Sequence, residues 1–432
     1  MRRHARLAVA VTVGISLLAA SCGDDKKSDS TTATTASTPA TSASTATSGS
    51  TTDSSTATSG ASTDSTSAGK DIKLDKTVVM TGLISDPGGN DKNAVPDMND
   101  GIRLAVKEIN AAGGVGGQQL SYETFETPPT GDAVINSFNL AVGKNPDVIL
   151  GPSSSATVLA IAKMADEAKI PLIHTATEPK VAHDAEAGSK YIFSNRPSNA
   201  GEAAAAATYT VKTLGKKKIG VMYVNSSFGL GGLAAIKAAV TAAGGEVVKE
   251  TAIEYNATDV TNNVLELKDV EAILNWGTPA TVGLTVKTLA QQGLTDITHV
   301  GPGSIGFGFF TKLVGDDTLL EGMNGVVDCN VAGSSDPAAK KFVADYQAEY
   351  KGQTPSYASA EMYDTVYLYV DAIKRAGSVD KEAVTKALEE TKDFKGVCTT
   401  YTQNNGILNH SADMVKFEKG KLVTLETVKA SD

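Results

Sequence analysis

Short runs of apolar residues alternate with amphipathic segments along most of the chain, and residues 148–179 show this alternation most clearly. The run Val148-Ile149-Leu150 is typical of a strand that is buried on both faces. An amphipathic segment follows, with Val158 and Ile161 on one face of the expected helix. A second apolar run covers 171–174. Strand, helix and strand in this order predict a right-handed βαβ unit of a parallel sheet.

Polar turns follow both strands of this unit. They consist of Ser153, Ser154 and Ser155 after the first strand and of Thr175, Ala176 and Thr177 after the second. The two turns meet at the carboxyl edge of the sheet, where open α/β sheets bind ligands. One serine is expected to cap the helix, and the N–H groups of the first helical turn favour an anion. Because no lysine or arginine accompanies the serines, the pattern favours a carboxylate over a phosphate.

The same alternation continues on both sides of this unit. Strands are expected at 77–84, 118–126, 218–224, 247–253, 270–275 and 298–301, and helices at 102–109, 133–143, 201–214, 233–240 and 278–292. The tetrapeptide Ala-Ala-Gly-Gly separates a helix from a strand at both 111–114 and 242–245, which indicates two similar α/β lobes. Past Asn324 the pattern predicts a helical run at 337–350, 357–376 and 381–390, followed by terminal strands near 398–401 and 414–418.

The first 21 residues predict a targeting segment. Arg2, Arg3 and Arg6 precede an uncharged apolar run at 7–20 that is too short for an ordinary membrane span. Small residues then precede Cys22, as in a bacterial lipobox, and predict that this cysteine carries a diacylglycerol anchor. The alternative is ordinary secretory cleavage with an idle cysteine. Residues 28–69 are almost entirely Ser, Thr and Ala and cannot bury a core, so 22–70 is expected to be a flexible tether.

Composition and charge exclude several classes of function. The 432 residues are 41% hydrophobic and 20% charged, which allows a large core and two or three domains. The net charge is −10, and it becomes −13 without the three arginines of the targeting segment. No basic stripe remains, so nucleic-acid binding is not expected. The sequence holds no HExxH, CxxC or EF-hand spacing, and we expect neither a metal nor another cofactor.

Two motifs resemble enzyme sites but favour other interpretations. The run from Gly301 to Gly306 matches GxGxxG, but it lies late in the chain and has a rigid proline at its second position. A glycine-rich cleft loop is therefore favoured over a dinucleotide site. His174 lies on an inward-facing strand and is interpreted as core or cleft wall rather than as a catalytic base. Since the serine turn is not a GxSxG elbow either, the chain is not expected to be an enzyme.

Four longer segments indicate a family. They read GIRLAVKEINAAGGVGGQQL (101–120), ILGPSSSATVLAIAKMADEAKIPLIHTAT (149–177), FSNRPSNAGEAAA (193–205) and FKGVCTTYTQNNG (394–406). In their order and spacing, the chain from about 71 to 424 resembles the type I periplasmic binding proteins of the leucine/isoleucine/valine-binding class, the extracytoplasmic receptors of branched-chain amino-acid ABC importers. The resemblance implies an α/β fold of two Rossmann-like lobes, joined by three hinge crossings, with a ligand cleft between them. Lobe 1 would comprise 71–196 and 328–394, and lobe 2 would comprise 197–327 and 395–432.

The resemblance also implies roles for single residues. Ser154 matches the serine that grips the ligand carboxylate, and Thr175 and Thr177 match positions that bind carboxylate and amine. Phe228 falls where the family often has tyrosine. Trp276 lies at a strand end that faces the cleft, so stacking on the ligand is favoured over a core position. The full expected ligand set is Ser153, Ser154, Thr175, Ala176, Thr177, Phe228, Trp276, Thr278, Gly303 and Ser304.

One position departs from the amino-acid binders of this family. Gly303 stands where those proteins have the acid that receives the ligand ammonium. An ammonium left unpaired in a closed cleft costs several kcal/mol. Either Glu178 or Asp328 substitutes for that acid, or the ligand lacks an amine and is an aromatic or aliphatic carboxylate or an amide.

Two cysteines remain once Cys22 is lipidated, an even number in an oxidising compartment. In the implied fold Cys329 and Cys398 both lie at hinge crossings, so a disulfide is expected, with two buried thiols as the alternative.

The leading hypothesis is a lipid-anchored solute receptor. It would bind a small amino acid, carboxylate or amide, close its lobes over that ligand, and present the closed form to an ABC permease and its ATPase. Its partners would be the small-molecule ligand, the transporter subunits and, through the lipid, the membrane. A ligand sensor that uses the same cleft is the alternative. A secreted α/β hydrolase comes third, since it needs a nucleophile–histidine–acid set that the sequence does not supply.

Overall fold

A computed structural model describes residues 72–84, 94–127, 132–177 and 189–430 of the chain. The predicted targeting segment, the lipidation site Cys22, the tether at 22–70, the polar loop at 85–93 and Glu178 lie outside the described residues. Among the helices of the described part, none is long and apolar enough to cross a membrane.

The first sheet is entirely parallel and has five strands in the order β2-β1-β3-β4-β5. The strands are β1 (Val78–Gly82), β2 (Leu120–Thr124), β3 (Val148–Leu150), β4 (Leu172–His174) and β5 (Ile192–Ser194). The central strands β3 and β4 are buried along their whole length, as their unbroken apolar runs predict. In the register, Met80 is paired with Val148 and Ile149 with Leu172.

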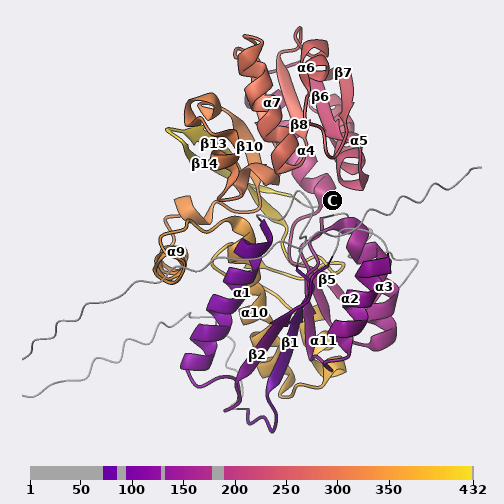
Figure 1. Cartoon of the computed structure of the whole chain (residues 1–432), viewed down its shortest axis with the longest axis vertical. Coiled ribbons are helices and arrows are strands. Elements are labelled where there is room, and N and C mark those ends of the chain that lie inside the picture. Colours follow the sequence, from indigo (N-terminus) through magenta and orange to yellow (C-terminus); the bar gives the residue numbers. More distant parts are fainter. Residues whose placement is uncertain (1–71, 85–93, 128–131, 178–188, 431–432) are drawn as a thin grey trace, which may run out of the picture. The chain divides into compact units, whose positions relative to one another are not determined.

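Helices cover both faces of this sheet (Figure 1). Side chains alternate along β3, so Val148 and Leu150 join a core with α1 (Ala94–Ala111) and α10 (Tyr357–Ala376). Ile149 points the other way, into a core with α2 (Asp132–Val142) and α3 (Ser155–Ala168). This period of two is the geometry of a pleated strand. The remaining helices of this region are α9 (Pro337–Glu349) and α11 (Lys381–Glu389).

The second sheet has seven strands in the order β14-β13-β10-β9-β8-β6-β7. Its parallel strands are β6 (Lys218–Val224), β7 (Glu246–Ile253), β8 (Ala272–Trp276), β9 (Thr298–Gly301) and β10 (Asn324–Val327). The strands β13 (Ser411–Glu418) and β14 (Lys421–Lys429) are added antiparallel at one edge. Helices α4 (Asn199–Lys212) and α5 (Ser227–Ala242) share a core on one face of the sheet, and α6 (Thr261–Glu266) and α7 (Pro279–Gln291) share a core on the other.

Short elements complete the fold. They are the helix α8 (Phe310–Val314), the 3-10 turns η2 (Gly303–Gly306), η3 (Asp317–Leu320) and η4 (Val331–Gly333), and the two-stranded pair β11 (Phe394–Lys395) and β12 (Thr400–Tyr401).

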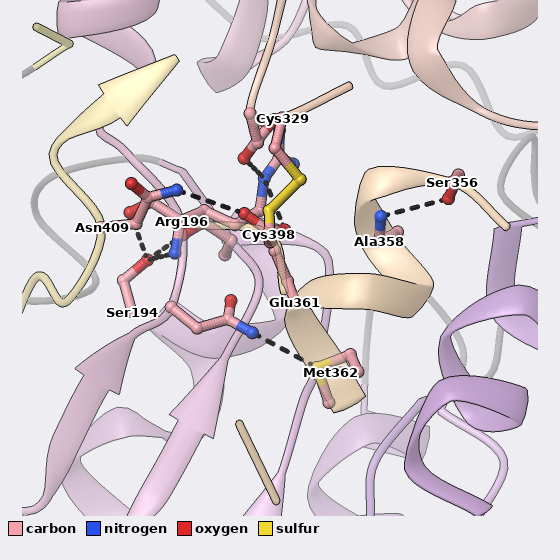
Figure 2. A network of polar contacts seen from close by, with 12 residues as sticks. Ser194, Arg196, Cys329, Ser356, Ala358, Glu361, Met362, Cys398 and Asn409 are labelled. Atoms are coloured by element: carbon pink, nitrogen blue, oxygen red, sulfur yellow. Dashed lines mark hydrogen bonds and ion pairs between the residues drawn. A yellow bond between two sulfur atoms is a disulfide. The ribbon is translucent and has the colours of Figure 1, made fainter. Parts of the chain in front are cut away.

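The chain passes between the two sheets at three places, and bonds tie these passages together. It passes to the second sheet after β5, leaves that sheet after β10, and returns to it before β13. Cys329, just after β10, forms a disulfide with Cys398 in the third passage (Figure 2). Ser194 N donates to Gly406 O (2.7 Å), and Leu408 N donates to Ser194 O (2.8 Å). The first and third passages therefore run side by side.

The mixed α/β fold class with parallel-sheet units is confirmed, and most expected elements lie within a few residues of their predicted bounds. Several elements escaped prediction, among them β10, β14 and α6. The helical run expected past Asn324 begins instead with the strand β10, whose four residues are too few to show a period. β14 is exposed along most of its length, so its mixed polar pattern resembles a tail. α6 has only six residues.

Candidate ligand-binding site

One cavity of about 710 Å³ is formed by residues that follow strands of both sheets. Residues after β3, β4 and β5 contribute from the first sheet, and residues after β6, β7, β8 and β9 contribute from the second. Parallel strands present their carboxyl ends at one edge, and ligands of open α/β sheets bind outside that edge. The lining residues are Met98, Ser153, Ser154, Ser155, Ala156, Thr177, Arg196, Glu202, Val224, Asn225, Ser226, Ser227, Phe228, Tyr255, Asn256, Gly277, Thr278, Pro279, Gly303, Ser304, Phe307 and Tyr357.

The helix start at the serine turn differs from the prediction in one respect. Ser154 occupies the N-cap of α3 with extended backbone angles (φ −86°, ψ 128°), yet its side chain makes no capping hydrogen bond within the described part of the chain. The expectation that a serine caps this helix is therefore wrong at the N-cap position. Ser198 and Ser226 do cap α4 and α5, by accepting from Gly201 N and Gly229 N. The Ser154 hydroxyl thus remains available to a ligand at the positive end of α3.

Of the second polar turn, only Thr177 lines the cavity. Thr175 and Ala176 are each 1% exposed and lie outside the lining. Thr175 N donates to Pro152 O (3.2 Å), and Ala176 N donates to Nδ1 of the buried His174 (3.1 Å). These bonds fix the shape of the turn, so Thr175 and Ala176 position Thr177 rather than contacting the space that a ligand would fill.

Trp276 does not line the cavity, contrary to the prediction that it stacks on the ligand. It is fully buried in the core with α4 and α5. Its Nε1 donates to Asn199 Oδ1 (2.7 Å), and Asn199 Nδ2 donates to Phe228 O (2.8 Å). Phe228 stacks on Trp276 with ring centroids 6.0 Å apart and is the aromatic residue of the pair that reaches the cavity. Trp276 therefore supports Phe228 from behind.

The other predicted residues line the cavity, but two of their hydroxyls are already engaged. Thr278 caps α7 by accepting from Thr281 N, and Ser304 Oγ donates to Gly277 O (2.8 Å). Ser153, Phe228 and Gly303 also line the cavity. A methyl group at Gly303 would lie 3.1 Å from Nη2 of Arg196 and 3.2 Å from Oδ1 of Asp328, so the small residue makes room for an ion pair.

That ion pair belongs to a buried charged cluster which sequence reasoning missed. Arg196 lines the cavity, so the inference that no arginine accompanies the serines is wrong. Its Nε and Nη2 donate to the two carboxylate oxygens of Asp328 at 2.5 and 2.6 Å. Glu202 and Glu361 each place an oxygen 3.8 Å from the guanidinium, and the Tyr357 ring lies 4.9 Å from Cζ. Asp328 is thus engaged by Arg196.

Burial sets the charge state of this cluster. It raises the pKa of Glu202 and of Glu361 well above the usual value, and the nearby Asp328 carboxylate raises both further. Burial alone would lower the pKa of Arg196, but Asp328, Tyr357 and Glu202 raise it. Burial therefore favours the protonated form of the two glutamic acids that flank the Arg196–Asp328 ion pair. Figure 2 shows Arg196 and Glu361, together with Asn409, whose Nδ2 donates to Glu361 Oε1 (3.5 Å).

A signal for this cluster exists in the sequence. Arg196 and Glu202 stand in FSNRPSNAGE, directly after the buried strand β5 and so at the same carboxyl edge as the serine turn. A charged residue at that position points toward a site. Its partners could not be found in this way, because Asp328 is 132 residues away.

Comparisons with known proteins agree with this architecture. The model of the periplasmic binding protein family matches residues 79–421. Leu/Ile/Val-binding protein homolog 8 of Brucella abortus (strain 2308) is 25% identical over 348 residues, which cover 75% of this chain and 84% of that protein. A branched-chain amino acid transporter substrate-binding protein from Streptococcus pneumoniae, solved in complex with isoleucine, is 23% identical with a TM-score of 0.73 and covers 83% of this chain and 99% of its own. A solute-binding protein of an ABC transporter from Rhodopseudomonas palustris BisB5, solved in complex with 3,4-dihydroxybenzoic acid, is 22% identical with a TM-score of 0.73 over 82% and 98% of the two chains.

The family match spans most of the chain, and the relatives are binding proteins rather than enzymes. The two parallel-sheet units and the cavity at their strand ends are the arrangement that a binding protein requires. The chain belongs to the periplasmic binding protein family.

Proposed function

We propose that this protein is the extracytoplasmic substrate-binding protein of an ABC importer and captures a small amino acid or a related carboxylate or amide. The observation that carries the proposal is the cavity, which both sheets line at their carboxyl edges. At one end of it the helix α3 begins, with the Ser154 hydroxyl left unused by capping. This end suits a carboxylate, because backbone N–H groups and the helix dipole favour negative charge.

Closure around the ligand is the proposed working step. Lobe 1 would comprise 71–196 and 328–394 and lobe 2 would comprise 197–327 and 395–432, with the three passages acting as the hinge. Sheet membership supports this division, because β1 to β5 belong to one sheet and β6 to β10, β13 and β14 belong to the other. A ligand that contacts residues of both lobes favours the closed form through its extra contacts in that form. The closed form would then be read by a membrane permease and its ATPase.

Anchoring through a lipid on Cys22 would keep the receptor beside its permease. Membrane fractionation of cells that express the C22A variant tests this part of the proposal. The variant is expected to leave the membrane fraction, and retention in that fraction would contradict the lipid anchor.

Ligand binding itself is tested by thermal shift with amino acids, aromatic acids and short amides. A ligand at 100 times its Kd adds about 2.7 kcal/mol to stability. Ser154→Ala and Thr177→Val are expected to weaken binding of the hit at least about tenfold, since each removes a cavity hydroxyl whose loss costs more than 1 kcal/mol. Thr175→Val is the matched control, because that residue lies outside the cavity lining. Equal affinity in all three variants would contradict the assignment of the site.

A further inference from the structure

The hairpin formed by β11 and β12 lies in the third passage, and Cys398 stands in its turn. Phe394, Val397 and Cys398 pack against the core that contains α1 and α10, and Tyr401 is buried in that core. The hairpin is therefore seated on the helices of the first sheet. Within the proposed division, 395–401 stand in the lobe 2 range but would follow the movements of lobe 1.

One carboxyl group on α10 fixes the turn of this hairpin. Asp364 is buried, and its Oδ1 accepts from Val397 N (2.7 Å) while its Oδ2 accepts from Cys398 N (2.9 Å) and from the Tyr401 hydroxyl (3.0 Å). A Cβ atom at Gly396 would collide with Oδ2 of Asp364, so the close approach requires a glycine. Pulling the turn away would leave a buried carboxyl group without its donors, which is unfavourable. Cys398 is therefore held on α10 by bonds other than its disulfide.

Cys329, the partner of Cys398, is held at the second sheet. It stands two residues after the end of β10 and is buried. The next residue, Asn330, donates through its backbone N to Oδ2 of Asp413 in β13 (2.9 Å) and through Nδ2 to Leu422 O in β14 (2.9 Å). These bonds tie the neighbour of Cys329 to the antiparallel edge of the second sheet.

The disulfide therefore connects an edge of the second sheet to a hairpin that is seated on helices of the first (Figure 2). Bonded cysteines keep their Cα atoms within about 4.4–6.8 Å in any conformation of the protein, and here the separation is 5.5 Å. The three chain passages can change their backbone dihedrals as hinge segments do. The disulfide adds a covalent connection beside them that cannot lengthen.

We propose that the Cys329–Cys398 disulfide is a strut across the hinge, which limits how far the two lobes open when no ligand is bound. With the bond in place, one lobe has to rotate against the other about a point close to it, so the unliganded protein samples a narrow range of openings. Without the bond that range widens and the binding-competent form becomes a smaller fraction of the population, which lowers the apparent affinity by the same factor. This inference rests on the proposed function, in which the lobes open and close around a ligand.

A distance measured between the two sheet units tests the strut. Leu159 in α3 and Leu230 in α5 are each half exposed, and their helices cover different sheets and approach each other. p-Acetylphenylalanine at both positions takes nitroxide labels without adding a cysteine. Double electron–electron resonance on the full chain without ligand then gives the distribution of the distance between the labels. The C329A/C398A variant is expected to show a broader distribution with a longer mean distance than the protein with its native cysteines.

Two further variants separate the strut from a general loss of stability. Asp364→Asn keeps the disulfide but turns an amide N–H toward the backbone donors of the hairpin, so it is expected to broaden the distribution less than the double variant does. Gly232→Ala is the matched control, because its new Cβ would press on the Trp276 indole inside the second unit and leave the strut intact. It is expected to keep the original distribution. Far-UV circular dichroism at the measuring temperature establishes that each variant is folded.

An unchanged distribution in C329A/C398A overturns the strut; should that variant not fold, an unchanged distribution in Asp364→Asn does so. Equal broadening in Gly232→Ala overturns it as well, because lost stability alone would then widen the opening. With the thermal-shift hit at saturation, the protein with its native cysteines and the double variant are expected to reach the same short distance, the double variant with the weaker affinity. A protein that binds no amino acid, carboxylate or amide overturns the proposed function, whereas the distributions without ligand still decide whether the disulfide restrains the two units.

Discussion

Removing the disulfide between Cys329 and Cys398 is expected to lower the free energy of unfolding by about 4 kcal/mol. The bond joins positions 69 residues apart, and closing a loop of that length removes about 15 cal/mol/K of chain entropy from the unfolded state. At 25 °C this entropy corresponds to about 4 kcal/mol. The double variant C329A/C398A is the perturbation, since alanine leaves no thiol to pair and no buried hydroxyl.

Guanidinium denaturation measures the effect with two probes. Trp276 is the only tryptophan of the chain and lies buried in the second sheet, so its fluorescence follows that region. Far-UV circular dichroism follows all helices and strands. If the fluorescence and circular-dichroism transitions coincide, unfolding is two-state and a single free energy of unfolding can be determined. Dithiothreitol is the matched control, because it should move the wild type to the midpoint of the double variant and leave the double variant unchanged.

A double variant within about 1 kcal/mol of the wild type would refute this reasoning. It would mean that the unfolded chain is already constrained around this loop, so that the covalent bond removes little further entropy.

Three further predictions concern other parts of the molecule. Asp328→Asn should destabilise the protein by about 3–5 kcal/mol in a urea titration, because it leaves the buried guanidinium of Arg196 without its bidentate partner. Glu123→Gln is the control: it removes an exposed ion pair with Lys144 and should change the free energy of unfolding by less than about 1 kcal/mol. Gly232→Ala should lower the free energy of unfolding by more than about 2 kcal/mol and shift the Trp276 emission, because the new Cβ would lie 2.0 Å from the indole ring. Gly283→Ala in α7 is the control: its Cβ meets only ordinary contacts beyond 3.4 Å, so it should be neutral or slightly stabilising. An unshifted emission spectrum in Gly232→Ala would contradict the packing of Trp276 against Gly232. Burial lowers the pKa of His299 to about 4, so its contribution to stability is complete above about pH 6.5 and is lost as pH falls toward 4, by up to about 3 kcal/mol. The raised pKa of Glu361 acts oppositely, with stability complete below about pH 4.5 and lost as pH rises. His299→Gln should flatten the acid limb of a stability–pH profile and Glu361→Gln the alkaline limb, and unchanged limbs would show that neither group titrates on unfolding.

Patterns local in sequence predicted the frame of the fold well. The unbroken aliphatic run at β3 predicted a strand buried on both faces, and the polar turn after it predicted the helix start of the candidate site. Period-two reasoning would also have placed Trp276 correctly. Ala272, Leu274 and Trp276 share one side of β8 and one core with α4 and α5, so the tryptophan follows its neighbours inward rather than toward the ligand.

Contacts between distant segments could not be predicted in this way. The charge of Arg196 is visible in the sequence, but its meaning depends on Asp328 and Glu361, which topology brings to it from other segments. The same holds for Ser154. The sequence identifies a preferred N-cap residue, and only the backbone geometry shows that its hydroxyl is not used for the cap.

The two edge strands of the seven-stranded sheet, β7 and β14, determine how readily two copies of the protein can pair edge to edge. An outermost strand has unpaired backbone groups to which a strand of another copy can add. Here β7 exposes Glu246, Lys249 and Glu250, and β14 exposes Lys421, Glu426 and Lys429. A second copy aligning along either strand would have to desolvate several of these charges. These charges therefore disfavour edge-to-edge pairing of two copies, although Val248, Val423 and Leu425 are exposed on the same strands.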